Sequence, residues 1–146
     1  MANQKFHQEE IVTHSPAETE SLGAKFAAIL TAPVCLILSG TLGAGKTHFV
    51  RGIASALGAK NETTSPTFAL VHEYKSTPPI AHLDFYRLKN EDDVWSVGLE
   101  DILADDLICI VEWGEKFQEL LPKKHWRVDF ELLNDSTRKI KFHYAS

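Results

Sequence analysis

Cysteine is scarce in this chain, and its two cysteines form no recognisable metal or redox motif. Cys35 and Cys109 lie within apolar runs at 34–38 and 107–111, and no CxxC pair occurs. A free thiol in such a run behaves as a small buried hydrophobe. The 7 histidines are scattered along the sequence without the close pairing that zinc sites use. We therefore expect two reduced core cysteines and no structural metal.

Long apolar segments and an excess of positive charge are also lacking. No segment approaches the roughly 18 apolar residues that a membrane-spanning helix needs, and residues 1–6 lack the apolar stretch of a signal peptide. We therefore expect a cytoplasmic protein with no membrane partner. The net charge is -5, which argues against binding nucleic acid through phosphate neutralisation alone. If a nucleic acid takes part, we expect a partner protein to hold it.

The remaining composition is typical of one globular domain. Hydrophobic residues make up 44% of the chain, aromatic residues 10% and charged residues 24%, which is ordinary for a folded protein and argues against disorder. A chain of 146 residues can bury a core of its own but is too short for two ordinary domains. We therefore expect a single domain over residues 1–146.

Hydrophobic periodicity predicts that helices alternate with strands in the first part of the chain. A helix is expected at 15–30, with Ser15 as its cap and Pro16 at its first position. The uninterrupted apolar run that follows, at 34–38, is typical of a strand covered on both faces. A second helix with one apolar face is expected at 46–57.

The rest of the chain predicts further strands, and the last two form a hairpin. The expected elements are a loop at 61–66, strands at 68–74 and 80–88, one or two short helices within 91–104, a strand at 107–111, and strands at 126–133 and 139–144. This order predicts an α/β fold with a mixed, mostly parallel sheet, flanking helices and a C-terminal antiparallel hairpin.

The sharpest chemical signal is residues 40–47, GTLGAGKT, which satisfy the phosphate-loop pattern GxxxxGK[ST]. The motif lies between a predicted strand and a predicted helix, as its mechanism requires. Glycines let backbone N–H groups face phosphate oxygens, Lys46 reaches the β and γ phosphates, and the Thr47 hydroxyl ligates magnesium. A glycine turn with an incidental lysine would not require both flanking elements. The sequence therefore predicts a P-loop NTPase domain.

Two carboxylates, Asp84 and Glu112, each follow an apolar run, as an acidic group near magnesium must. One could hold magnesium, directly or through water, while the other orients or deprotonates an attacking water. The residue types alone do not assign these roles. His82 and Tyr86 lie two residues either side of Asp84, where they could orient it, although packing is the commoner role. Trp113 could pack near a nucleotide or be half-buried core.

These motifs, taken in order, resemble the TsaE (YjeE) family of small bacterial ATPases of tRNA threonylcarbamoyladenosine biosynthesis. The resemblance covers residues 15–144 and rests on the phosphate loop, TSPTF (64–68), HLDFYRL (82–88), GLE (98–100) and IVEWGE (110–115). It implies a single α/β phosphate-loop domain. It also implies action with TsaD and TsaB, which install the threonylcarbamoyl group on the adenosine next to the anticodon in tRNAs that read codons beginning with A.

The resemblance further implies cofactors and site residues. The expected cofactors are ATP or ADP and Mg²⁺, with ATP hydrolysis weak in isolation and stimulated by the partners, and with tRNA reached only through them. Catalytic residues are expected to be Lys46, Asp84 and Glu112, and metal ligands Thr47 and Glu112. The nucleotide is expected to contact Gly43, Ala44, Gly45, Lys46, Thr47, His48 and Trp113, with Ser15, Pro16 and Arg138 near the base or phosphates and Ser65 and Thr67 in a switch-like loop.

Two residues depart from the family pattern. Thr41 replaces an Asp, and His48 replaces the second Thr of a GKTT run. The second change removes any role for that hydroxyl, although the His48 backbone N–H can still face the α phosphate.

Other nucleotide-binding classes fit the sequence less well. A small GTPase would carry an NKxD guanine-reading motif and a DxxG loop, and neither occurs. A small-molecule kinase would usually need a lid with several arginines, but the region beyond Glu112 offers only Arg127 and Arg138. A non-catalytic partner module whose nucleotide is structural stays open.

Overall fold

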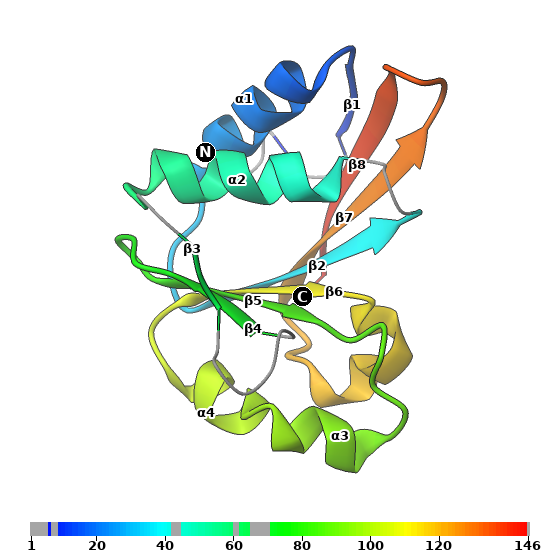
Figure 1. Cartoon of the computed structure of the whole chain (residues 1–146). Coiled ribbons are helices and arrows are strands. Elements are labelled where there is room, and N and C mark those ends of the chain that lie inside the picture. The colour runs from blue at the N-terminus through cyan, green and yellow to red at the C-terminus, as the bar shows by residue number, and fades with distance from the viewer. Residues whose placement is uncertain (1–5, 7–8, 42–44, 60–61, 65–70, 146) are drawn as a thin grey trace.

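The computed structural model describes residue 6 and residues 9–41, 45–59, 62–64 and 71–145. Within them, eight strands form one sheet with helices on both faces (Figure 1). The strands are β1 (Glu10–Thr13), β2 (Val34–Gly40), β3 (Glu62–Thr64), β4 (Val71–Tyr74), β5 (Ile80–Asp84), β6 (Ile108–Glu112), β7 (His125–Leu132) and β8 (Arg138–Ala145). The helices are α1 (Pro16–Ala27), α2 (Lys46–Ala56), α3 (Glu91–Ser96), α4 (Leu99–Ala104) and the 3₁₀ helix η2 (Gly114–Leu120). None of the helices in this part of the chain is long and apolar enough to cross a membrane.

The strand order is β1-β8-β7-β2-β6-β5-β4-β3. The pairs β7–β2, β2–β6 and β6–β5 are parallel, and the outer pairs are antiparallel. The predicted α/β fold, with its mixed sheet and C-terminal antiparallel hairpin, is confirmed. Parallel pairing is confined to the centre of the sheet, because hairpins and short edge strands extend it on both sides.

Several element boundaries differ from the prediction. The strand predicted at 80–88 ends at Asp84, because the Asp84 carboxylate accepts a hydrogen bond from the Tyr86 N–H (2.9 Å) and turns the chain. β3 lies within the predicted loop at 61–66, and β1 and η2 have no counterpart in the prediction. β1 (4 residues) and β3 (3 residues) are short edge strands, and each pairs with a single neighbour, β8 or β4. Their hydrophobic pattern alone is too short to predict them.

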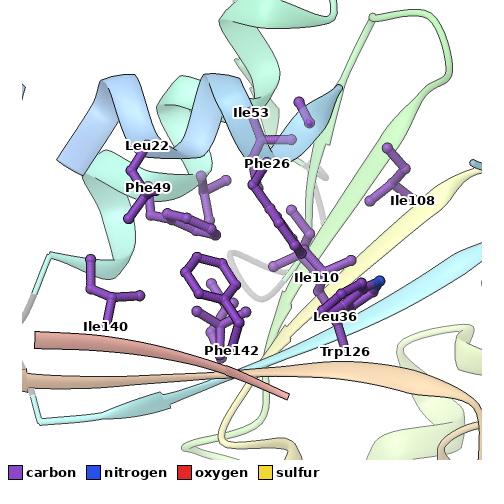
Figure 2. Close-up of a cluster of buried hydrophobic side chains, with 14 of the residues drawn as sticks. Leu22, Phe26, Leu36, Phe49, Ile53, Ile108, Ile110, Trp126, Ile140 and Phe142 are labelled. Atoms are coloured by element: carbon purple, nitrogen blue, oxygen red, sulfur yellow. The ribbon is translucent and has the colours of Figure 1, made fainter. Parts of the chain in front are cut away.

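The two faces of β2 enter two separate cores, as a strand covered on both faces requires. Leu36 and Leu38 face α1 and α2, while Cys35 and Ile37 face α3, α4 and η2. Both cysteines are free and buried, as the sequence predicts. In the first core, Phe26 and Phe49 point from the helices toward Phe142 and Trp126 on the strands (Figure 2). The Phe26 and Phe142 ring centroids are 4.9 Å apart.

Helices α1 and α2 approach each other at glycines, which brings α1 against the helix that follows the phosphate loop. A Cβ placed on Gly52 would lie 1.9 Å from the Glu20 carbonyl oxygen, and one on Gly23 would lie 2.2 Å from the Phe49 carbonyl oxygen. Only glycine permits backbones this close. The position of α1 therefore depends on these two residues.

We expect Gly52→Ala to lower the free energy of unfolding by about 1–3 kcal/mol, because the added methyl group forces α1 away from α2. Denaturant unfolding measures this change. Ser55→Ala, at an exposed position on the same helix, is the control and should change stability by no more than about 0.5 kcal/mol. Equal stability of the Gly52 variant and the wild type would contradict the close packing.

Candidate functional site

The site lies at the carboxyl ends of the central parallel strands. The phosphate-loop motif connects the end of β2 to the start of α2, and Asp84 and Glu112 are the last residues of β5 and β6. Asp84 and Glu112 are register partners, and Glu112 is also the partner of Leu38 on β2. Ligands of open α/β sheets bind at this edge, beyond the carboxyl ends of the strands. Three segments distant in sequence thus meet at one place.

The phosphate loop has the backbone that its glycines permit. Gly40 has φ 132° and Gly45 has φ 101°, in the region that favours glycine. Gly45 is the N-cap of α2 and provides no side-chain cap for the first N–H groups, those of Lys46, Thr47 and His48. Such uncapped N–H groups at a helix N-terminus suit an anion. Among the predicted site residues, Gly43, Ala44, Ser65 and Thr67 lie outside the described residues.

Lys46 is buried at the centre of the site, with its side chain 5% exposed. Its Nζ donates a hydrogen bond to the Gly40 carbonyl oxygen (2.8 Å) and lies 3.5 Å from Glu112 Oε1. The same ammonium group lies 5.5 Å from the centre of the Trp113 ring, within range of a cation–π interaction. The lysine charge is therefore held between the phosphate loop and the end of β6.

Each oxygen of Glu112 has its own partner. Oε1 faces Lys46, and Oε2 lies 2.7 Å from Nε2 of His82 on β5. Burial favours a raised pKa for Glu112, but the hydrogen bond from His82 and the nearby positive groups outweigh it, so the pKa of Glu112 is lowered. An ionised carboxylate only accepts hydrogen bonds, so His82 Nε2 carries the donated proton.

Asp84 lies beside Glu112 but has different contacts. Its Oδ1 accepts the hydrogen bond from the Tyr86 N–H, and the next residue, Phe85, donates its N–H to the Glu112 carbonyl oxygen (2.9 Å). Of the two residues that could orient Asp84, His82 contacts Glu112 instead. Tyr86 does hold the Asp84 carboxylate, through its backbone N–H.

The side-chain oxygens of Thr47, Asp84 and Glu112 line one cavity of about 220 Å³. It is lined by Thr47, Val50, His72, Tyr74, His82, Asp84 and Glu112. Hydroxyl and carboxylate oxygens are the donors that Mg²⁺ prefers, and Mg²⁺ on a nucleotide usually keeps waters and needs only one or two carboxylates. The oxygen donors of this cavity fit that requirement. In the described part of the chain, no three His, Cys, Asp or Glu side chains gather closely enough to hold a metal by themselves.

The segments that follow Asp84 and Glu112 are tied to each other. Lys116 Nζ donates hydrogen bonds to the carbonyl oxygens of Tyr86 and Leu88, both at 2.8 Å. The rings of Tyr86 and Trp113 have centroids 5.0 Å apart. Trp113 has φ 62°, an unusual backbone conformation for a residue with a side chain. These contacts join segments that are distant in the sequence, so no local pattern predicts them, and they fix how Trp113 faces Lys46.

The N-terminal turn of α1 and the final hairpin border the phosphate loop on its other side. A Cβ on Gly45 would lie 3.4 Å from Thr19 Cγ2 and 3.5 Å from Arg138 Cδ and Nε. The α1 cap is formed as predicted, because Ser15 Oγ accepts a hydrogen bond from the Glu18 N–H (3.1 Å), with Pro16 at the first helical position. Arg138 thus packs directly against the loop, while Ser15 and Pro16 lie one turn before Thr19, the α1 residue in contact.

Comparison with known proteins gives consistent matches. A family model described as "Threonylcarbamoyl adenosine biosynthesis protein TsaE" matches residues 13–140. The chain is 34% identical to the "tRNA threonylcarbamoyladenosine biosynthesis protein TsaE" of Treponema pallidum, covering 88% of this chain and 96% of that one. It is 38% identical to the Rickettsia bellii protein of the same name, covering 88% and 90%. The crystal structure of Bacillus subtilis YdiB superposes with a TM-score of 0.78 at 31% identity, covering 95% and 86%.

Proposed function

We propose, because the chain belongs to the TsaE family, that it binds ATP with Mg²⁺ at the edge of the sheet described above and hydrolyses it. Proteins of this family take part in tRNA threonylcarbamoyladenosine biosynthesis. The observation that carries the proposal is the convergence of Lys46, Thr47, Asp84 and Glu112 at the ends of β2, β5 and β6. A phosphate-binding helix start, a buried cation and two carboxylates are the parts that phosphoryl transfer requires.

The residues of the chain divide the binding task. The first N–H groups of α2 and the Lys46 ammonium would hold the phosphates, and Thr47 and Glu112 would hold the cation. Bound magnesium would neutralise developing charge on the phosphate oxygens. If the Lys46 ammonium moves to a bound phosphate, it would leave its position 3.5 Å from Glu112. Oε1 of Glu112 would then be available to the cation.

Asp84 is the residue that we assign to the general-base position. Its Oδ1 accepts a hydrogen bond from the Tyr86 N–H, which holds the carboxylate in the lining of the cavity. The other oxygen would orient an attacking water or accept its proton. Trp113, held by Tyr86 and facing Lys46, would lie on the nucleotide side of the site, and Arg138 would approach the phosphates from the opposite side.

The proposed partners are TsaD and TsaB, which would carry the tRNA. The net charge of -5 is unfavourable for direct phosphate contacts with RNA. We therefore place the RNA on the partners and assign to this chain the coupling of its nucleotide state to its docking on them. Docking would reset the modifying complex between cycles.

We expect weak ATP hydrolysis by the isolated protein and a rise on the order of 10³-fold with TsaB and TsaD, because a positioning group supplied in trans is worth that much in related phosphoryl transfers. Phosphate release from ATP and Mg²⁺, with and without the two partners, measures it. Each partner alone is the control. Full activity in isolation would contradict the need for partners, and no hydrolysis under any condition would favour a module whose nucleotide is structural.

A further inference from the structure

The hydrogen bond between His82 and Glu112 involves neither the phosphate loop nor Lys46. We propose that His82 is a positioning residue, which fixes Oε2 of Glu112 so that Oε1 is left to face the cation that accompanies the nucleotide. This inference rests on the proposed function, because it concerns the same carboxylate. His82 would hold the Glu112 carboxylate and would not itself contact the nucleotide.

The two partners of Glu112 differ in whether they are also expected to bind the nucleotide. Lys46 Nζ lies 3.5 Å from Oε1, and in the proposed function this ammonium group also binds the phosphates. His82 Nε2 lies 2.7 Å from Oε2, and the proposed function assigns His82 no contact with the phosphates. When Lys46 moves away, a carboxylate held by lysine alone would be free to follow it. The His82 hydrogen bond keeps Glu112 in place while Oε1 becomes available.

The surroundings of His82 make it a rigid support. β5 is an interior strand, paired with β4 on one side and β6 on the other. The neighbouring side chains of Ala81 and Leu83 are buried in the core, which fixes the backbone on both sides of His82. His72 on β4 is the register partner of His82, and the two rings lie 6.1 Å apart. The imidazole therefore lies between a neighbouring ring and the carboxylate that it holds.

A space-filling histidine would have different requirements. The His82 side chain is 12% exposed and lines the same cavity as Thr47 and Asp84. Packing alone would be satisfied by any apolar side chain of similar size, and the direction of the ring nitrogens would not matter. A positioning role requires a donor at the place of Nε2. Groups that orient a metal-binding side chain typically contribute 10- to 100-fold to metal affinity or activity.

Binding of ADP, which is not hydrolysed, tests the proposal without relying on activity. Calorimetric titrations with and without Mg²⁺ give the magnesium-dependent gain in nucleotide affinity. His82→Leu removes the donor, and His82→Asn has an amide that reaches only as far as Nδ1. His82→Gln has an amide nitrogen that reaches about as far from the backbone as Nε2. His143→Leu, at an exposed position on β8, is the matched control.

We expect His82→Leu and His82→Asn to lose about 10-fold or more of the magnesium-dependent gain, with ADP affinity in the absence of Mg²⁺ changed less than about twofold. His82→Gln and His143→Leu should retain most of the gain. If His82→Leu and His82→Asn both keep the same magnesium-dependent gain as the wild type, the positioning role is overturned and the proposed function is not. Equal loss of affinity with and without Mg²⁺ would overturn it in favour of a structural role. Failure of the wild type to bind any nucleotide would overturn the proposed function, and this inference with it.

Discussion

Lys46→Met should reduce partner-stimulated ATP hydrolysis by at least about 100-fold while the protein stays folded. The ammonium group is the buried cation at the start of α2, and no other lysine described in the structure contacts both the phosphate loop and Glu112. Removing one pre-organised charge or donor from a transition state costs about 3–4 kcal/mol. Methionine keeps the length and apolar stem of the lysine, so the core around α2 stays filled.

Phosphate release with TsaB and TsaD measures this loss, and the unfolding temperature without nucleotide measures the fold. Lys123→Met, at an exposed position before β7, is the matched control and should behave as the wild type. Thr47→Ala should lose activity to a similar extent, because the exposed hydroxyl is the proposed magnesium ligand on α2. Near-normal hydrolysis by Lys46→Met would contradict the proposed mechanism.

Glu112→Gln should also reduce turnover by orders of magnitude, and it should differ from Asp84→Asn in its response to magnesium. Glutamine keeps the shape of Glu112 but loses the charge that would hold the cation. Asparagine at position 84 still accepts the Tyr86 N–H, so the turn after β5 is preserved. We expect both variants to be slow, with only Glu112→Gln losing the magnesium-dependent gain in ADP affinity. Equal loss of this gain in both variants would contradict the division of roles.

The difference in the free energy of unfolding between the wild type and Glu112→Gln, measured without ligand, should depend on pH. The lowered pKa of Glu112 means that folding favours its ionised form. This carboxylate therefore stabilises the protein above its unfolded pKa of about 4.3, and the contribution is lost as the pH falls through the lowered folded pKa. The wild type should be more stable than the variant near pH 7, and the difference should fade in acid. Denaturant unfolding at several pH values measures it, and a difference independent of pH would contradict it.

The sequence alone determined the parts of this site that depend on local spacing. The phosphate loop is eight consecutive residues between a strand and a helix, so its glycines, Lys46 and Thr47 are recognisable without any tertiary information. The Ser15 cap and the apolar strand at 34–38 are local in the same sense. Asp84 and Glu112 could be proposed because each ends an apolar run, and the carboxyl ends of parallel strands meet at one edge.

Only the tertiary structure decided which side chains share a contact. His82 and Glu112 are 30 residues apart, and their hydrogen bond exists because β5 and β6 pair in a register that places Asp84 beside Glu112. A shift of one residue would turn these side chains to the opposite face. The edge strands β1 and β3 were missed for the same reason, since each is a short segment defined by the partner it pairs with. Register is a property of two segments together, and neither segment alone encodes it.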